Sequence, residues 1–227
     1  MSKLYIAIVL LTLIQSSFCE LGIDVSQLFS VQNYTCAKNN GITFGIPRGY
    51  CSYGGLDKNA VQSLKNMKAA GLKTDVYMFP CRGKNATAQA HELIDSIPSD
   101  LYSRVWLDIE SNPSPGCSWG DHNGTSNCDF TMELIKAVKG KGKSVGIYAS
   151  KYMWTTIFSS QTACSQASVD VPLWYAHYDN NPSFSDFTAF AGWKQPNIKQ
   201  YHGTESFCGA SVDRSWRPWS IPKQQPF

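Results

Sequence analysis

The residues best suited to chemistry are two acids, Asp108 and Glu110, which close the apolar segment RVWLDIE. Residues two apart on a β-strand point to the same side, so both carboxyl groups would share one face. Like charges at close range cannot both ionise freely, so the pKa of one carboxyl group should rise. The protonated acid could then donate a proton while its ionised neighbour stabilises positive charge or attacks, as glycosidic bond cleavage requires.

A single pair of this kind is more often two solvated acids at the end of a strand. Two further acids change that balance: Asp24 in GIDVS ends the first predicted strand, and Asp213 in SVDRS ends the last. If the sheet closes into a barrel, its first and last strands are neighbours and their ends meet at one mouth. We therefore predict that the catalytic residues are Glu110, Asp108, Asp24 and Asp213.

Aromatic residues near the same strand ends favour a saccharide as the ligand, because sugar rings stack their apolar faces on aromatic planes. Each aromatic taken alone is more often part of the core than of a binding site. Their coincidence with four strand-end acids predicts a sugar-binding cleft. The predicted substrate-binding residues are Tyr77, Phe79, Tyr148, Trp174 and Tyr178.

Short segments rich in β-branched and aromatic residues, bounded by turn residues, predict eight strands. They span residues 21–27, 42–50, 73–80, 104–110, 144–150, 172–178, 197–203 and 210–213. Helical spacing of apolar residues predicts helices between several of them. These span 57–71 with Asp57 as N-cap, 85–97, 129–140 with Asp129 as N-cap, and 151–160.

The alternation of strands and helices predicts an α/β fold with parallel strands and right-handed crossovers. A chain of 227 residues fits one domain, and about eight strands favour an irregular TIM-like β/α barrel. The barrel should be irregular because helical patterns thin out after residue 160. An open doubly wound sheet is the alternative, weakened by the lack of a glycine-rich loop after the first strand.

The first residues carry Lys3, then a short apolar run and small residues, which is typical of a secretory signal peptide over residues 1–19. The run is too short for the alternative, a membrane anchor, which needs about 20 apolar residues. We expect a catalytic domain over 20–220 and a tail over 221–227. The expected location is extracellular, or the lumen of a lysosome-like vesicle, with no membrane contact after cleavage.

The formal charge of +3 falls to +2 without residues 1–19, which is too weakly basic for a nucleic-acid partner. Seven of the eight cysteines remain in the mature chain, so at least one is free or pairs outside it. Expected pairs are Cys117 with Cys128, across a small loop, and Cys51 with Cys81, across two adjacent loops. No Cys/His spacing suggests a metal site.

Three Asn-X-Thr triplets predict glycosylation in a secreted protein, at Asn33, Asn85 and Asn123.

The ordered motifs GIDVSQ, VYMFP, RVWLDIE, GIYAS, LWYAHY, KQY and SVDRS resemble those of the family 25 glycoside hydrolases, lysozymes that act on peptidoglycan. The resemblance runs over residues 21–216. It implies an irregular β/α barrel with an acidic groove, and no cofactor. It also implies cleavage of the β-1,4 bond between N-acetylmuramic acid and N-acetylglucosamine with retention of configuration, by a monomer whose partner is bacterial peptidoglycan.

By the same resemblance, Glu110 is the acid/base, and Asp108 is the nucleophile or orients a substrate N-acetyl group that attacks in its place. Asp24 and Asp213 would tune the charge and bind the −1 sugar. The chain departs from the family pattern at Arg48, where bacterial members often carry a Lys-Ala-x-Glu-Gly-like stretch, and at Lys199, where a tryptophan is common. The extra cysteines suggest an animal-type branch, with a role in antibacterial defence or digestion. A lysozyme-like protein that binds glycans or regulates immunity without cleaving is the alternative.

Overall fold

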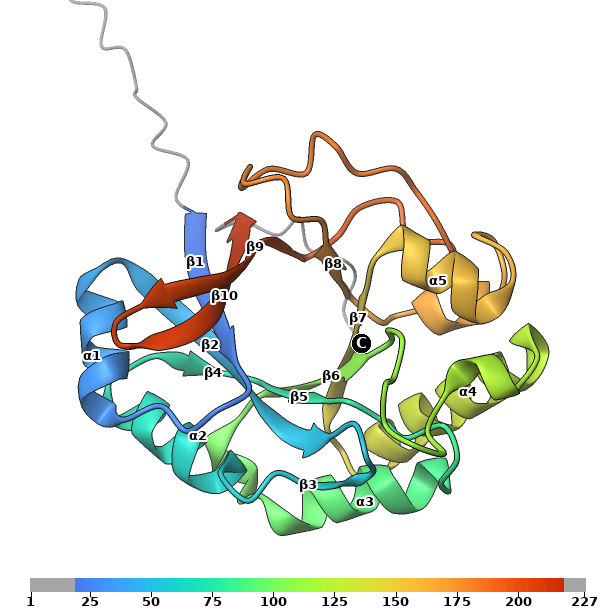
Figure 1. The fold of residues 1–227 in the computed structure, drawn as a ribbon, viewed down its shortest axis with the longest axis horizontal. Helices are drawn as coiled ribbons and strands as arrows, with labels where there is room; N and C mark the ends of the chain where they lie inside the picture. The colour runs from blue at the N-terminus through green and yellow to red at the C-terminus, as the bar shows by residue number, and fades with distance from the viewer. Residues whose placement is uncertain (1–18, 219–227) are drawn as a thin grey trace, which may run out of the picture.

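Residues 19–218 are described by a computed structural model, in which strands form a closed barrel with helices packed around much of its outside (Figure 1). The predicted signal peptide, apart from Cys19, and the predicted tail over 221–227 lie outside the described residues. Within residues 19–218, every helix is too short or too polar to cross a bilayer.

Eight strands make the barrel, in the order β1, β10, β9, β8, β7, β6, β5 and β2, and the pairing of β1 with β2 closes the ring. Two short strands, β3 and β4, pair with β2 at its edges. The strands are β1 Cys19–Val25, β2 Ile42–Cys51, β3 Gly55–Leu56, β4 Lys73–Thr74, β5 Val76–Met78, β6 Arg104–Asp108, β7 Ser144–Ala149, β8 Leu173–Ala176, β9 Ile198–Phe207 and β10 Ala210–Pro218. The closed barrel, and not the open sheet, is therefore the correct alternative.

The parallel arrangement expected for all strands is wrong at one place, where β10 runs antiparallel to both β9 and β1. The reason is a two-residue turn at Cys208 and Gly209, which have φ angles of 50° and 83°. Two consecutive residues with positive φ make the turn whose twist suits a hairpin. In Figure 1 this hairpin lies beside β1 and completes the ring without a crossover helix.

The four predicted helices are present, but two begin elsewhere, and one further helix was not predicted. They are α1 Val31–Asn39, α2 Ala60–Ala69, α3 Ala86–Ser96, α4 Gly124–Gly140 and α5 Lys151–Phe158, with 3-10 turns at Ser99–Leu101, Trp119–Asp121 and Ser165–Ser168. The unpredicted α1 has little amphipathic pattern and is started by Ser30, whose Oγ accepts the backbone N–H of Asn33.

Both predicted N-caps are wrong for local reasons. The helix α2 begins after Asn59, which makes no side-chain cap bond, so Asp57 lies two residues before the N-cap position. Asp57 still accepts the backbone N–H of Asn59 at 2.9 Å through Oδ1, and its Oδ2 forms an ion pair with Arg48 at 2.7 Å. The helix α4 begins before Asp129 because the side chain of Asn123 accepts the backbone N–H of Ser126 at 2.9 Å. A capping side chain that satisfies an orphan N–H fixes the start of a helix more strongly than apolar spacing does.

Aromatic rings fill the barrel below the mouth. The ring of Trp174 packs edge-on against Trp106 at 5.8 Å and against Tyr148 at 4.8 Å between centroids. Gly146 leaves room for this cluster, since a Cβ there would lie 2.4 Å from the Trp106 ring. A larger apolar layer lies between the sheet and the helices α2 to α5. The floor of the mouth is thus a rigid, well-packed surface.

Three disulfides link segments that are distant in the sequence: Cys36–Cys208, Cys81–Cys117 and Cys128–Cys164. The predicted pairs Cys117–Cys128 and Cys51–Cys81 are therefore wrong. Cys117 lies on the loop after β6, and the backbone N–H of Arg82 donates to its carbonyl, so the adjacent loop after β5 supplies its partner. Cys51 is buried and unpaired, and Cys19 is unpaired at the start of β1.

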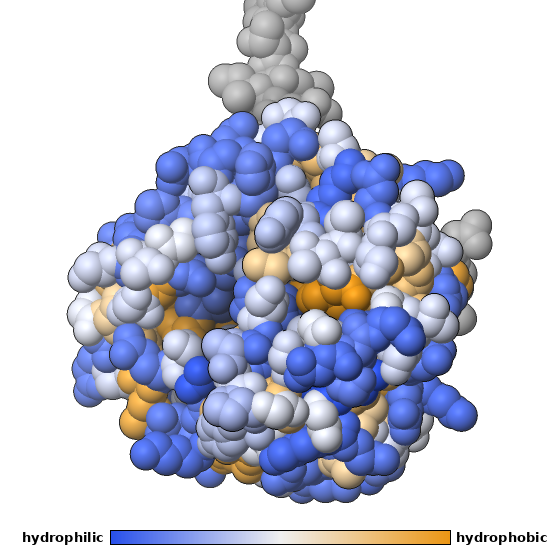
Figure 2. Space-filling model, turned by 45° about the vertical axis from the view of Figure 1, so that its right-hand side comes forward, coloured by the Kyte–Doolittle hydropathy of each residue, from blue (hydrophilic) through white to orange (hydrophobic). Residues whose placement is uncertain are grey.

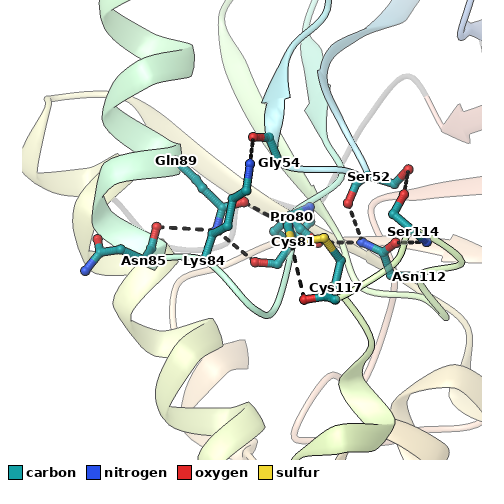
Figure 3. Close-up of a disulfide and its surroundings, with 11 residues drawn as sticks. Ser52, Gly54, Pro80, Cys81, Lys84, Asn85, Gln89, Asn112, Ser114 and Cys117 are labelled. Atoms are coloured by element: carbon teal, nitrogen blue, oxygen red, sulfur yellow. Dashed lines mark hydrogen bonds between the residues drawn. A yellow bond between two sulfur atoms is a disulfide. The ribbon is translucent and has the colours of Figure 1, made fainter.

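Hydrogen bonds reinforce the loops around Cys81–Cys117, as Figure 3 shows. The side chain of Gln89 accepts the N–H of Cys81 at 2.8 Å and donates to its carbonyl at 2.9 Å. The amide of Asn112 donates to the carbonyl oxygens of Ser52 and Pro80. The loops that follow β2, β5 and β6 are thus tied to one another at the carboxyl end of the barrel.

The face of the molecule in Figure 2 is mostly hydrophilic, with smaller hydrophobic areas between the polar residues. Large apolar side chains that are exposed within the described residues are Leu28, Tyr53, Tyr152, Val169 and Tyr178.

Candidate active site

A small pocket of about 100 Å³ opens at the carboxyl ends of the parallel strands. It is lined by Asp24, Tyr77, Asp108, Glu110, Tyr148, Trp174, Tyr178, Gln200 and Asp213. The structure therefore brings together all four predicted acids and four of the five predicted aromatics. Their proposed chemical roles remain predictions.

Backbone pairing places the acids. Asp24 on β1 lies directly opposite Asp213 on the antiparallel β10. Asp108 is the last residue of β6 and is adjacent to Tyr148 of β7. The N–H of Ile109 still donates to the carbonyl of Tyr148 at 2.9 Å, which continues the strand geometry by one residue. Glu110 consequently lies on the same side as Asp108, as the spacing of two residues predicts.

A neutral residue, Gln200 on β9, connects the acids to the aromatic wall. Its Nε2 donates to both carboxylate oxygens of Asp24, at 2.9 and 3.0 Å, and to Asp213 at 3.2 Å. Its Oε1 accepts the hydroxyls of Tyr148 at 2.7 Å and Tyr178 at 2.8 Å. This role could not be predicted from the sequence, because an isolated glutamine is not typical of any one kind of site. The motif KQY, which contains Gln200, contributed only to the family resemblance.

Burial raises the pKa of all four carboxyl groups. The pKa of Asp108 lies well above its usual value because the group is buried, with Glu110 and Asp24 as nearby charges. Burial and Asp213 likewise raise the pKa of Glu110 and of Asp24, and burial raises that of Asp213 itself. We expected a raised pKa for only one acid of the pair Asp108 and Glu110. The structure differs, because burial raises the pKa of both, and of the other two acids as well.

Asp108 and Glu110 differ in accessibility. The Asp108 side chain is 6% exposed, and its Oδ1 is buried without a hydrogen-bond partner. Glu110 is partly exposed to the pocket. A buried acceptor without a donor is costly, so the pocket has unused capacity to bind a donor group from a ligand.

The aromatic wall has fixed and accessible members. Trp174 is 2% exposed, and its Nε1 donates to Ser215, so it forms the base of the pocket. Tyr178 is 55% exposed and forms an accessible edge. Phe79 does not line this pocket. The strand β5 ends at Met78, so the alternation that directs Tyr77 inward does not extend to Phe79.

A buried lysine fixes the segment behind Tyr178. Lys199 is fully buried on β9, and its Nζ lies 2.7 Å from Asp179 and 2.6 Å from Asp186. His177 joins the cluster through Nδ1, 2.6 Å from Asp186. His177, Asp179 and Asp186 have ligand atoms close enough for a metal ion, but Lys199 already forms ion pairs with both acids. Nothing in the sequence around Lys199 indicates this role, because its two acidic partners lie 20 and 13 residues away along the chain.

The three predicted glycosylation sites differ in geometry. Asn85 and Asn123 are exposed N-caps of α3 and α4. Asn33 lies within α1, is partly buried, and donates through Nδ2 to the carbonyl of Cys208. Because Asn33 is partly buried and its side-chain nitrogen faces the Cys208 carbonyl, the exposed Asn85 and Asn123 are the better acceptors.

Comparisons with known proteins agree with this geometry. The family model described as Lysozyme-like protein 1 matches residues 15–201. Probable GH family 25 lysozyme 2 of Dictyostelium discoideum is 39% identical, covering 87% of this chain and 90% of its own. Counting factor 45-1 of the same organism is 35% identical, covering 95% and 72%.

The bacterial lysozyme from Streptomyces coelicolor has the same fold, with a TM-score of 0.74 at 24% identity, covering 89% of this chain and 93% of that one. The family match and the 39% identity over nearly the full length of both chains carry the assignment. The chain belongs to the family 25 lysozymes, which are glycoside hydrolases.

Proposed function

We propose that the protein is a secreted lysozyme that hydrolyses the β-1,4 bond between N-acetylmuramic acid and N-acetylglucosamine in bacterial peptidoglycan, with retention of configuration. The observation that carries this proposal is the pocket in which four carboxyl groups meet an aromatic wall at the barrel mouth. Acids with raised pKa values beside a stacking surface suit protonation of a glycosidic oxygen.

Glu110 is the proposed proton donor, because its raised pKa lets it hold a proton and it is more exposed than Asp108. It would protonate the leaving glycosidic oxygen, and its carboxylate would then accept a proton from the attacking water. Asp24 and Asp213, held by Gln200, would bind the −1 sugar and favour positive charge at its anomeric carbon.

Asp108 has two possible roles that experiment can separate. As a nucleophile it would form a bond to the anomeric carbon, and a slow 2-fluoro substrate would trap a glycosyl-enzyme adduct on Asp108. If it instead orients the substrate N-acetyl group, no adduct forms and a thiazoline analogue of the cyclised sugar inhibits. Peptide mapping of the trapped protein distinguishes these outcomes.

The direct test of the acid assignment is Glu110→Gln, with the exposed Glu133→Gln on α4 as the matched control. We expect Glu110→Gln to lower the rate of turbidity loss of a bacterial wall suspension by about 10²–10⁴-fold, the usual contribution of a general acid. The fold, followed by circular dichroism, should be unchanged. Wild-type cleavage of purified peptidoglycan by Glu110→Gln would overturn the assignment.

A second candidate function is glycan binding or signalling without cleavage, favoured by the relative named Counting factor 45-1. An inactive binder would sediment with the wall and leave its turbidity unchanged. The presence of all four acids in one pocket favours the enzyme. The three disulfides fit an oxidising compartment, which supports secretion and a role in defence or digestion.

A further inference from the structure

A second cavity, of about 440 Å³, lies at the amino end of the barrel, opposite the acid pocket. Its lining includes Arg104 and Ser144, the first residues of β6 and β7, and Arg217 near the end of the antiparallel β10. Cavities that hold small molecules commonly measure about 300–1,000 Å³. The cavity is therefore large enough for a ligand.

Two of its lining residues carry buried polar atoms without a partner. Arg104 Nε and the Tyr102 hydroxyl oxygen are both buried, and neither forms a hydrogen bond within the described residues. Both groups are hydrogen-bond donors. Most buried donors in proteins are satisfied, so two orphans at one cavity indicate that an acceptor belongs there.

The charge around the cavity favours a negatively charged acceptor. Lys68, Lys73, Arg104 and Arg217 line it together with the acids Asp75 and Asp100. Lys68 pairs with Asp100, while Lys73 and Arg217 both pair with Glu20. No described acid lies within ion-pair distance of Arg104, which is the excess cation.

The nearest candidate to neutralise Arg104 is already engaged. Asp75 accepts the indole N–H of Trp106 at 3.0 Å, and burial raises the pKa of its carboxyl group. Arg104 itself packs over the Trp106 ring at 5.2 Å. Burial lowers the pKa of Arg104, the charge of Asp75 raises it, and the charge of Arg217 lowers it. A guanidinium group held in this way gains most from an oxyanion, which it can bind with two parallel hydrogen bonds.

We propose that this cavity binds a small oxyanion, a phosphate or carboxylate group, whose oxygens accept hydrogen bonds from Arg104 and Tyr102. The site is separate from the acid pocket, and its occupation does not depend on glycan cleavage. A bound anion would satisfy both orphan donors and balance the excess cation at once. It would also stabilise the folded protein, by an amount that grows with the logarithm of the anion concentration above the dissociation constant.

The test is isothermal titration calorimetry of the full chain with two probes, inorganic phosphate and citrate, at an ionic strength held constant with NaCl. We expect saturable binding of at least one probe with a Kd of about 1 mM or lower. Tighter binding of phosphate assigns a phosphoryl ligand, and tighter binding of citrate assigns a carboxylate. The absence of saturable binding of either probe below about 10 mM overturns the proposal.

Variants locate the binding. Arg104→Gln should weaken binding by about tenfold or more, the usual effect of losing a charged hydrogen bond. Tyr102→Phe removes only a hydroxyl, should fold, and should weaken binding several-fold. Lys139→Gln, an exposed cation on α4, controls for net charge, and Glu110→Gln controls for the acid pocket; both should bind as the wild type does. Unchanged affinity in Tyr102→Phe and Arg104→Gln would contradict the proposed site.

Discussion

The two ends of the barrel differ in the sign of their charge and in how the fold manages it. At the carboxyl end, four acids surround one pocket, and Gln200 donates hydrogen bonds to two of them. At the amino end, Arg104 is partly buried near Arg217, and its Nε has no hydrogen-bond partner among the described residues. The acid end is organised by hydrogen bonds between side chains, whereas Arg104 is held mainly by packing on Trp106.

This difference shows where the fold tolerates uncompensated charge. Closely packed side chains, most of them aromatic, fill the centre of the barrel. Disulfides join the loops and helices around it. Like charges at either end can therefore remain close without opening the structure. Such groups cluster at functional sites, where they cost stability and supply chemistry or binding.

The largest loss of folding stability should come from removing the residue that organises the acid end. Gln200→Leu removes the hydrogen bonds that Gln200 makes to four side chains, and it lets Asp24 and Asp213 repel each other. We expect peptidoglycan cleavage to fall by about 10²-fold or more, because small displacements at a reacting centre are that costly. Chemical unfolding should show a loss of about 2–3 kcal/mol.

A companion variant makes this prediction specific. Gln200→Glu keeps the shape and adds a fifth acid, so its cleavage defect should be severe at neutral pH and smaller at pH 4–5, where the carboxyls are protonated more fully. A Gln200→Glu defect that does not change with pH would show that charge balance is not what Gln200 supplies.

Lys199→Met should have the next largest effect, because it leaves Asp179 and Asp186 to repel each other. The segment that carries Tyr178 would loosen, so we expect KM to rise several-fold while kcat changes less. Stability should fall by about 1–3 kcal/mol. Steady-state kinetics with a soluble muropeptide substrate checks this, and an equal fall in kcat with constant KM would contradict a positioning role.

Asp108→Asn should abolish cleavage yet stabilise the protein. Because the pKa of Asp108 is raised in the folded state, folding is favoured when the group is protonated, and this contribution is lost as pH rises through the raised pKa. The variant should therefore melt a few degrees above the wild type at pH 7, with the gap closing towards pH 4. A wild type more stable than the variant at pH 7 would refute the raised pKa.

The smallest effect is expected at the amino end. Arg104→Met replaces a partly buried cation, whose Nε has no hydrogen-bond partner, with an apolar side chain of similar length over the Trp106 ring. We expect a change of about 1 kcal/mol or less in phosphate-free buffer, in the stabilising direction. Melting curves in buffer with and without phosphate check this, since phosphate should stabilise only the wild type. A large destabilisation without phosphate would mean that Arg104 is structural.

The sequence is most informative where a function depends on strand ends. Asp24, Asp108 and Glu110 could be placed at one mouth because parallel strands share a carboxyl end. Asp213 reaches the same mouth for a different reason than the one expected, because it lies opposite Asp24 within the antiparallel β10 and not at the end of a parallel strand. The same reasoning failed for Phe79, since it assumed that β5 continues past Met78.

Features that depend on loop conformation could not be predicted. Cys81 pairs with Cys117 because two neighbouring loops run together, and Cys128 pairs with Cys164 because α4 starts earlier than its apolar pattern suggests. The hairpin at Cys208 requires a positive φ at a residue that rarely adopts it. Tertiary contacts decide these details, and local sequence patterns do not carry them.

Mass spectrometry of peptidoglycan digested by the full chain tests the central claim most directly, with Glu110→Gln as the comparison. If the four-acid pocket is a lysozyme active site, the new reducing ends will be N-acetylmuramic acid, and they will be nearly absent from the Glu110→Gln digest. New reducing ends on N-acetylglucosamine, or the same products from both proteins, would contradict the account.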